Sequence, residues 1–258
     1  MKSKEFASEQ YDRIYASGGV ERIYELPYQH SGYYPLFKEV HRALKRRGVR
    51  SALEVGCGTG GLANLLQDRE PDIAYRGFDF SPVAVQRASI RLGQPELFFV
   101  GDARAKESYR ENSEAIVCTE VLEHIDADLE VVAQWAPGAY CVCSVPNFDA
   151  DNHVRHFRSE EAVRQRYGSL IDIERITTVK KPFLTNLSAR SRGRALLWNR
   201  YRPLRLLAIM GLASFRTLGG WYVFSGCRTQ MRDVDPIAAS ASDSSNVAKA
   251  ILPASHSL

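Results

Sequence analysis

The stretch Leu53-Glu54-Val55-Gly56-Cys57-Gly58-Thr59-Gly60 decides how this chain folds. Its apolar start predicts a buried strand, its glycines predict a tight turn, and the following Gly61-Leu62-Ala63-Asn64-Leu65-Leu66 predicts a helix. Glycines let the backbone turn sharply and approach a ligand closely, and the N–H groups at the helix start face that ligand. The stretch therefore predicts a nucleotide-like ligand at this turn.

Glu54 narrows the choice of nucleotide. Gly56, Gly58 and Gly61 fit the spacing G-x-G-x-x-G, which by itself is weak evidence for a dinucleotide. A carboxylate two residues before the first glycine would clash with a pyrophosphate, but it suits a ligand that carries an ammonium group. The pattern E-x-G-x-G-x-G resembles the first motif of class I S-adenosylmethionine-dependent methyltransferases, in which the acidic residue lies near the methionine end of the cofactor.

Three further segments resemble later motifs of that family, in the same order. A strand ends at Asp79, whose carboxylate can accept hydrogen bonds from both ribose hydroxyls. By resemblance, Asp102 meets the adenine amino group and Ala103 donates a backbone N–H to the ring. Thr119-Glu120-Val121-Leu122-Glu123-His124-Ile125 is similar to the E-V-L-E-H segment of many members. The resemblance, which covers about residues 24–228, implies these cofactor-binding residues: Glu54, Gly56, Cys57, Gly58, Gly60, Asp79, Phe80, Asp102, Ala103 and Glu120.

Strand-like and helix-like segments alternate along the chain, which indicates an α/β fold with a mostly parallel sheet. The expected strands are 53–55, 74–79, 97–100, 115–118, 139–145, 171–176 and 221–226, with helices between them. The resemblance implies a Rossmann-like sheet of seven strands with helices on both faces. Its strand order would be 3-2-1-4-5-7-6, with the last strand antiparallel between the fifth and sixth.

Composition and local patterns suggest how the chain is divided. We expect an N-terminal helical cap over residues 1–50, a methyltransferase domain over 51–232 and a disordered Ala/Ser-rich tail over 237–258. The aromatic-rich part of the cap, residues 21–47, would form one or two helices over the cofactor. The start of the chain has no charged segment followed by an apolar run, and its five cysteines contain no C-x-x-C pair, so we expect reduced thiols and a cytoplasmic location.

Positive charge is concentrated in one part of the sequence, which includes an insertion at about residues 180–220. Between Lys180 and Arg232 there are eleven Lys or Arg residues and no Asp or Glu, although the net charge of the whole chain is only +4. Apolar residues and Trp198 are interleaved with these charges. Such a segment suits an anionic membrane surface or a lipid-linked acceptor, while nucleic-acid phosphates or a merely solvated helical cap are the alternatives.

Histidines near the ends of the fourth and fifth strands are candidate catalytic bases. Methyl transfer to a hydroxyl needs alignment and removal of the acceptor's proton, and histidine titrates in the suitable range. His124, His153 and His156 lead this group, and we select His124 and His156, together with Glu120, as the catalytic set. The sequence does not identify the acceptor, because acceptor pockets come from the variable regions.

A metal site is an alternative for the same region. Glu120-x-x-Glu123-His124 with a downstream histidine resembles the metal site of small-RNA 2′-O-methyltransferases, and quinone-pathway O-methyltransferases contain related pairs. Oxygen and imidazole ligands suit Mg²⁺, Mn²⁺ or Zn²⁺. However, the E-V-L-E-H segment is also common in members that use no metal, and His153-Val154-Arg155-His156-Phe157-Arg158 stands where the RNA enzymes have an F-E-W stretch.

The sequence therefore predicts an S-adenosylmethionine-dependent methyltransferase that methylates oxygen on a small-molecule, sugar or lipid-linked acceptor. A metal-dependent RNA 2′-O-methyltransferase is the first alternative. Two further alternatives belong to other functional classes: an NAD-dependent oxidoreductase and a catalytically silent module that only binds the cofactor. Glu54, Asp102 and Glu120 argue against the oxidoreductase.

Overall fold

The computed structural model describes residues 5–18, 24, 26–110, 112–180, 215 and 219–229. The insertion at 180–220, apart from a few residues at its ends, and the expected tail at 237–258 lie outside the described residues. The strands are β1 (Ser51–Val55), β2 (Ala74–Asp79), β3 (Phe98–Val100), β4 (Ala115–Cys118), β5 (Tyr140–Pro146), β6 (Ile171–Lys180) and β7 (Gly220–Arg228). The α-helices are α1 (Ser8–Ala16), α2 (Tyr34–Arg47), α3 (Gly61–Arg69), α4 (Pro82–Leu92), α5 (Asp128–Ala133) and α6 (Glu160–Tyr167). Short 3-10 helices are η2 (Tyr28–His30), η3 (Pro95–Leu97), η4 (Lys106–Tyr109) and η5 (Leu122–His124).

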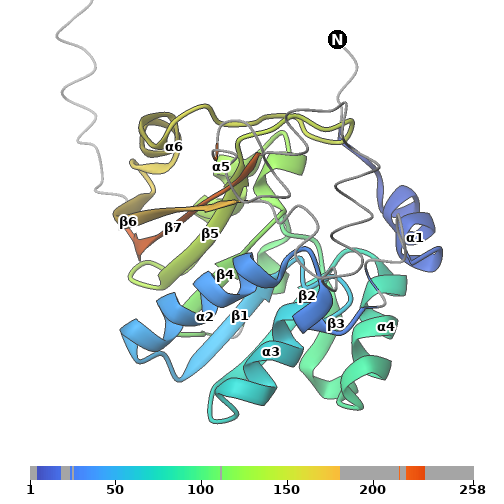
Figure 1. Ribbon diagram of the computed structural model, residues 1–258. Coiled ribbons are helices and arrows are strands. Elements are labelled where there is room, and N and C mark those ends of the chain that lie inside the picture. The colour runs from blue at the N-terminus through green and yellow to red at the C-terminus, as the bar shows by residue number, and fades with distance from the viewer. Residues whose placement is uncertain are drawn as a thin grey trace, which may run out of the picture.

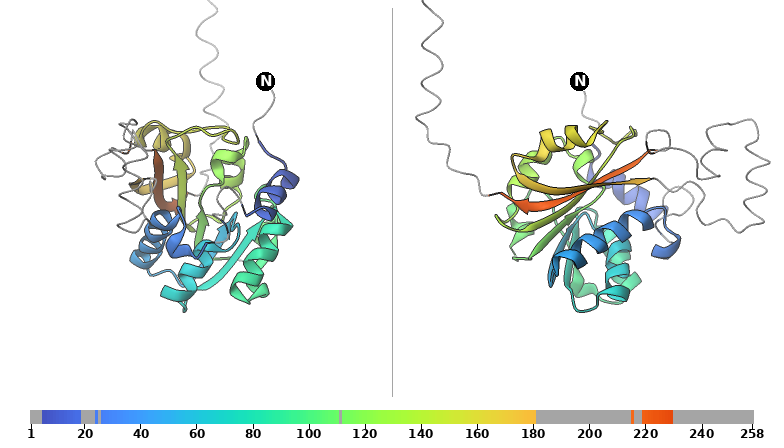
Figure 2. Two further views of the ribbon diagram at one scale, coloured as in Figure 1. Left: turned by 45° about the vertical axis from the view of Figure 1, so that its right-hand side comes forward. Right: turned by 60° about the vertical axis from the view of Figure 1, so that its left-hand side comes forward.

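The seven strands form one sheet in the order β3-β2-β1-β4-β5-β7-β6, which confirms the sequence prediction. β1 to β5 pair in parallel, and β7 pairs antiparallel with both β5 and β6. Figure 1 shows the sheet with helices packed around it, and Figure 2 shows that the helices cover both of its faces. Gly226 is required in β7, because a Cβ there would lie 1.9 Å from the backbone oxygen of Asp172 on β6.

Alternating side chains on the central strands build two separate apolar cores. In β5, Val142 faces the core beneath α2 and α3, whereas Cys141 and Cys143 face the core beneath α5 and α6. The two cysteines are fully buried on one face, because side chains two residues apart in a strand point the same way. The sheet is buried on both sides in its middle, and the carboxyl ends of β1, β2 and β4 are the edge left for a ligand.

Helix-capping residues fix where two of the helices begin. The Ser81 hydroxyl accepts a hydrogen bond from the Ala84 N–H at 3.1 Å, and Pro82 occupies the first turn of α4. Ser159 caps α6 in the same way, accepting from the Ala162 N–H at 3.1 Å. Serine suits both positions, because its side-chain oxygen accepts from an N–H group of the first turn that has no partner within the helix.

The N-terminal segment expected as a cap divides into two parts with different surroundings. α2 packs on the sheet against β5, β6 and β7, and it contributes Leu36, Val40 and Leu44 to the core. α1 packs on α4, near the carboxyl ends of the strands. The aromatic stretch therefore supplies a helix of the domain itself, while the helix beside the ligand edge comes from residues ahead of it.

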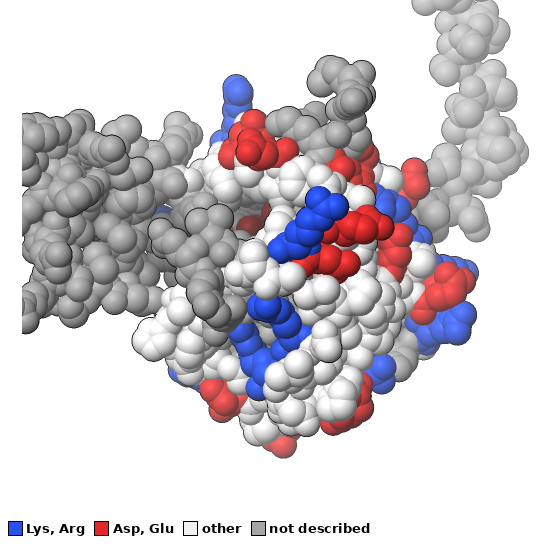
Figure 3. Space-filling model, turned by 90° about the vertical axis from the view of Figure 1, so that its right-hand side faces the viewer, with Lys and Arg blue, Asp and Glu red and all other residues white. Residues whose placement is uncertain are grey.

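Charge on the described surface is mixed. On the face shown in Figure 3, blue Lys and Arg groups lie beside red Asp and Glu groups. Ion pairs such as Arg50–Glu114 and Lys45–Glu70 bring opposite charges within 3.1 Å and 2.7 Å. In the described part of the chain, no helix is long and apolar enough to cross a membrane.

A buried ion-pair network ties the segment after β4 to the loop after β5. Asp128 is fully buried and accepts hydrogen bonds from Arg166 at 2.9 and 2.5 Å and from the Tyr167 hydroxyl at 2.7 Å. Arg155 lies 3.2 Å from the same carboxylate and donates to the carbonyls of Leu122 and Ile125, both at 2.5 Å. The network therefore holds η5, which carries Glu123 and His124, against the rest of the domain.

Replacing Asp128 with Asn is expected to destabilise the protein by about 3 kcal/mol, because it leaves the largely buried guanidinium group of Arg155 and the partly buried one of Arg166 without their carboxylate. Chemical denaturation measures this change. The matched control is Asp151→Asn, since Asp151 is exposed, and it should leave the free energy of unfolding within about 0.5 kcal/mol of the wild-type value. Equal stability of the two variants would contradict a bracing role for Asp128.

Candidate functional site

The glycine turn after β1 is built around positive backbone angles. Gly56 and Gly58 have φ values of 72° and 51°, in the left-handed region that glycine favours. A Cβ on Gly56 would lie 2.3 Å from Cγ2 of Val121, so the turn and the segment after β4 approach closely there. The N–H groups of Gly56 and Cys57 both donate to the Phe78 carbonyl, at 2.8 and 2.9 Å. The turn is thereby fixed against the end of β2.

Asp79, at the end of β2, also holds this turn. Its carboxylate accepts from the Gly58 N–H and from the Ser81 N–H, each at 2.9 Å. Burial raises the pKa of Asp79 to about 6, although these backbone hydrogen bonds act in the opposite direction. The carboxylate therefore joins the glycine turn to the start of α4.

Glu54 is buried at the end of β1, with 3% of its surface exposed. The Tyr75 hydroxyl donates a hydrogen bond to its carboxylate. Burial raises the pKa of Glu54 to about 8, with Tyr75 acting to lower it. A positive charge near this carboxylate would favour its ionised form.

The residues expected around adenine lie after β3. The exposed Asp102 accepts a hydrogen bond from the Arg104 N–H at 2.8 Å, and its own carbonyl accepts from the Ser108 hydroxyl at 2.8 Å. Ala103 is buried, and its carbonyl accepts from the Tyr109 hydroxyl at 2.7 Å. Both expected residues are therefore held in a defined loop.

Two cavities meet at this edge of the sheet. The smaller, of about 80 Å³, is lined by Asp79, Phe80, Asp102 and Ala103. The larger, of about 720 Å³, is lined by Glu54, Cys57, Gly58 and other residues. Of the residues expected to bind the cofactor, Gly60 lines neither cavity. It is the N-cap residue of α3, with a φ of 75°, and a Cβ there would lie 3.2 Å from Cβ of Ala88. The residues common to both cavities are Tyr11, Tyr15, Gly56, Glu120 and His124.

Sequence reasoning missed the two tyrosines of α1. Tyr15 lies over the glycine turn, with its hydroxyl 3.5 Å from the position of a Cβ on Gly58. The Tyr11 ring packs edge-on against Phe80, with centroids 5.2 Å apart, and its hydroxyl accepts from Asn152 at 3.2 Å. The helical spacing of Tyr11, Ile14 and Tyr15 was the available signal for an aromatic helix face.

The segment after β4 carries two carboxyl groups. Glu120 has a φ of 58°, the only positive value at a non-glycine residue in the described ranges, and its N–H donates to the Ser144 hydroxyl at 3.1 Å. The Glu123 side chain is fully buried, and neither carboxyl oxygen has a hydrogen-bond partner within ordinary distance among the described residues. Burial raises the pKa of Glu123 to about 7.

His124 lies beside both cavities in a fixed tautomer. Its Nδ1 is 2.9 Å from the Asn152 carbonyl, which can only accept, so Nδ1 carries the proton and Nε2 is left as an acceptor. Burial lowers the pKa of His124, while the carbonyl acts to raise it. The imidazole is therefore neutral at pH 7 and able to take a proton.

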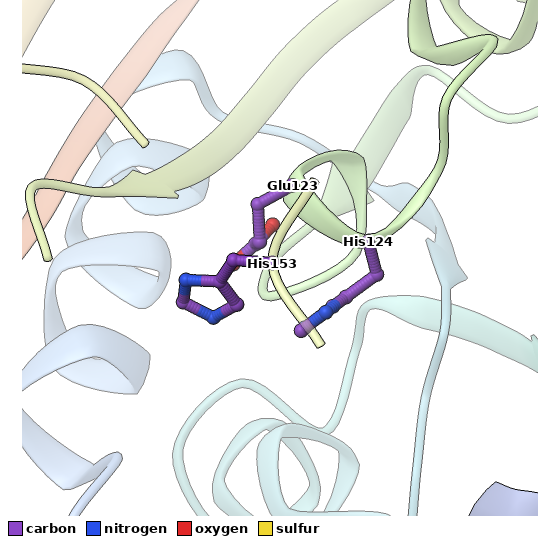
Figure 4. Close-up of side chains that lie close together, drawn as sticks. All are labelled: Glu123, His124 and His153. Atoms are coloured by element: carbon purple, nitrogen blue, oxygen red, sulfur yellow. The ribbon is translucent and has the colours of Figure 1, made fainter. Parts of the chain in front are cut away.

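A second histidine approaches from the loop after β5. The Nδ1 of His153 lies 3.1 Å from the Phe148 carbonyl, and the His124 and His153 ring centroids are 5.0 Å apart. Figure 4 shows His153 beside Glu123 and His124 of η5. One possible ligand atom from each of the three residues lies within 4.8 Å of the others. By type and position, these residues could hold a metal ion.

The structure separates the three expected catalytic residues. Glu120 and His124 line both cavities. His156 is exposed, lines neither cavity, and has the Asp149 carboxylate 4.0 Å from its Nδ1. Among the catalytic candidates, the ligand edge therefore brings together Glu120 and His124.

Comparison with known families settles the assignment that this geometry points to. A family model described as a methyltransferase domain matches residues 28–189, more than half of the chain. The chain belongs to this methyltransferase family. With its strand order and cofactor motifs, it is a class I S-adenosylmethionine-dependent methyltransferase, which excludes the oxidoreductase alternative.

Curated relatives of the methyltransferase include a trans-aconitate 2-methyltransferase of Streptomyces coelicolor. It is 27% identical over 53% of this chain and 48% of its own length. A malonyl-[acyl-carrier protein] O-methyltransferase of Anoxybacillus flavithermus is 31% identical over 38% of this chain and 39% of its own. The chain thus spans about half, or less, of these relatives' lengths.

A solved structure with the same fold is the N-methyltransferase NodS of Bradyrhizobium japonicum in complex with S-adenosyl-L-homocysteine. Its TM-score is 0.54 at 17% identity, and the match covers 85% of this chain and 97% of NodS. S-adenosylmethionine is the methyl donor of this methyltransferase. The buried carboxyl group of Glu54 suits the ammonium group of this cofactor, and the Asp79 carboxylate can accept hydrogen bonds from its ribose hydroxyls.

Replacing Glu54 with Gln is expected to make the stability of the empty protein less dependent on pH. Because the folded protein raises the pKa of Glu54 to about 8, the folded state binds more protons than the unfolded state between about pH 5 and 8. Stability therefore falls as pH rises through this window. In the Glu54→Gln variant, the decrease in the free energy of unfolding across this window should be smaller by on the order of a few kcal/mol.

Denaturant titrations at pH 5, 6, 7 and 8 measure this difference. Glu107→Gln, at an exposed position, is the matched control and should follow the wild-type curve. Parallel pH curves for Glu54→Gln and wild type would show that burial of Glu54 does not shift its titration.

Proposed function

We propose that the methyltransferase transfers a methyl group to a hydroxyl oxygen of a small-molecule, sugar or lipid-linked acceptor. The observation that carries this proposal is the neutral, tautomer-fixed His124 at the junction of the two cavities. A hydroxyl acceptor must lose its proton during transfer, and His124 supplies a base at that point.

The two cavities divide the work of binding. We infer that Asp79, Phe80, Asp102 and Ala103 hold the adenosine part of the cofactor in the smaller cavity. Glu54 would face the ammonium group from the larger cavity. The residues common to both cavities would then surround the reacting centre.

Each group near the reacting centre has a chemical task. Bound S-adenosylmethionine supplies a methyl group on a positively charged sulfur, which leaves as a neutral thioether. Nε2 of His124 accepts the hydroxyl proton as the new oxygen–carbon bond forms. Glu120, beside both cavities, stabilises the positive charge that His124 then carries. Tyr11 and Tyr15 exclude water from this point.

The basic insertion is proposed as the part that meets an anionic surface or a lipid-linked acceptor. Support comes from its sequence, which combines clustered Lys and Arg with apolar residues and Trp198. Peripheral contact with a membrane would bring the protein to such an acceptor, with the rest of the domain in the cytoplasm. Flotation with anionic liposomes at low salt tests the contact, and absence of binding would contradict it.

The second candidate function is metal-dependent 2′-O-methylation of RNA. The cluster of Glu123, His124 and His153 favours it, because one possible ligand atom from each residue lies within 4.8 Å of the others. The Asn152 carbonyl accepts from Nδ1 of His124 and leaves its Nε2 for an ion. A metal held there would acidify an acceptor hydroxyl. The clustered arginines of the insertion would then contact phosphates.

The class of acceptor is tested with methyl-labelled S-adenosylmethionine and a cell extract that is fractionated after incubation. We expect label in the lipid or small-molecule pool. Label in RNA would favour the second candidate, and binding of S-adenosylhomocysteine without any transfer would favour a silent module. His124→Gln should lower the transfer rate at least about 100-fold while retaining cofactor binding. His156→Gln should stay near the wild-type rate, because His156 lines neither cavity.

Chelation followed by metal-free dialysis separates the two candidates further. We expect the transfer rate to be unchanged, because a neutral His124 can take the proton without a metal. Loss of activity that added Mg²⁺, Mn²⁺ or Zn²⁺ restores would support the metal site of the second candidate. His153→Gln then adds a check, since it should abolish that restoration.

A further inference from the structure

The larger cavity has an aromatic end formed by segments far apart in the sequence. Tyr33 and Phe37 come from the start of α2, Phe148 follows β5, and Trp221 lies at the start of β7. The Trp221 ring centroid is 5.8 Å from that of Tyr33 and 6.3 Å from that of Phe148. The four rings form a continuous surface, which we call the aromatic wall. It belongs to none of the cofactor motifs.

Trp221 also carries an unused hydrogen-bond donor. Its side chain is 1% exposed, and its Nε1 has no hydrogen-bond partner among the described residues. Indole N–H groups usually find a partner when they are buried, because an unpaired donor costs free energy. Because Nε1 itself is covered, a ligand with an acceptor oxygen next to the wall would supply the missing partner after a small rotation of the ring toward the cavity.

The charges around the larger cavity do not suit an acceptor with several negative charges. Arg91 is the only Lys or Arg in the described part of the lining, and its guanidinium group donates to the Tyr24 carbonyl. The acidic groups of the lining are Glu54 and Glu120. Among the described residues of the lining, a di- or tricarboxylate would therefore meet acids without matching cations.

We propose that the aromatic wall is the acceptor subsite and that it takes an uncharged, flat aromatic compound bearing a hydroxyl group. The acceptor ring packs against Tyr33, Phe37 and Phe148, and an oxygen on it accepts a hydrogen bond from Trp221 Nε1. This inference rests on the proposed O-methyl transfer and names its class of substrate. It also separates this methyltransferase from the relatives that are named for malonyl-[acyl-carrier protein] and for trans-aconitate.

The test measures binding to the protein saturated with S-adenosylhomocysteine, by calorimetry. The probes are 2-naphthol as a neutral aromatic hydroxyl compound, trans-aconitate as an anion and methyl α-glucoside as a sugar. We expect 2-naphthol to bind at least about ten-fold more tightly than the other two. Tighter binding of either other probe, or no measurable binding of 2-naphthol, would overturn the proposal.

Two matched variants test the donor itself. Trp221→Phe keeps a ring in the wall but removes the N–H. It should lower the affinity for 2-naphthol about five-fold, which corresponds to the contribution of one ordinary hydrogen bond. Trp135→Phe is the control: Trp135 is equally buried but lies in the opposite core and lines neither cavity. Unchanged S-adenosylhomocysteine affinity shows that both variants are folded. Equal 2-naphthol affinity in the two variants would remove Trp221 from the subsite.

Measurements of binding and of turnover distinguish the proposed O-methyl transfer from the proposed aromatic subsite. If 2-naphthol binds through Trp221 but no hydroxyl compound in the extract is methylated, the O-transfer proposal fails and the subsite stands. If label enters small molecules but 2-naphthol does not bind, O-transfer stands and the aromatic subsite is wrong.

Discussion

Four carboxyl groups are gathered at the carboxyl edge of the sheet, and much of the site depends on them. Glu54, Asp79 and Glu123 are buried, and burial raises the pKa of each above its ordinary value. Glu120 lies beside both cavities. In the empty protein, the ionised forms of Glu54, Asp79 and Glu123 are disfavoured, and a bound cation would relieve that penalty. This arrangement suits a sulfonium cofactor and opposes one with a pyrophosphate.

Most of the fold could be predicted from short stretches of sequence, because backbone angles, helix caps and the alternation of side chains in strands depend on neighbouring residues. Gly56 and Gly58 need positive φ values at the turn after β1, and Ser81 and Ser159 cap the helices that they precede. Alternating residues in β5 face separate cores. The strand order followed from the family resemblance, which the topology confirms. Length and composition alone would not have placed β7 between β5 and β6.

The other features of the candidate site depend on contacts between segments far apart in the sequence, and no local pattern contains these contacts. Tyr11 and Tyr15 reach the ligand edge because α1 packs on α4. His124 acquires its tautomer from the carbonyl of Asn152, 28 residues away, while His156, the other histidine selected from the sequence, lies at the surface. The sequence predicts Trp221 only as the first residue of a strand, and the packing of β7 against Tyr33 and Phe148 makes it part of a cavity wall.

The number of protons exchanged when S-adenosylmethionine binds tests the central role of the buried carboxyl groups most directly. Calorimetry at pH 7 in two buffers of different ionisation enthalpy gives this number for the wild-type protein and for Glu54→Gln. If a cationic ligand drives ionisation of Glu54, whose pKa is raised to about 8 in the empty protein, the wild type should release more protons than the variant. Equal proton exchange in the two proteins would contradict the account.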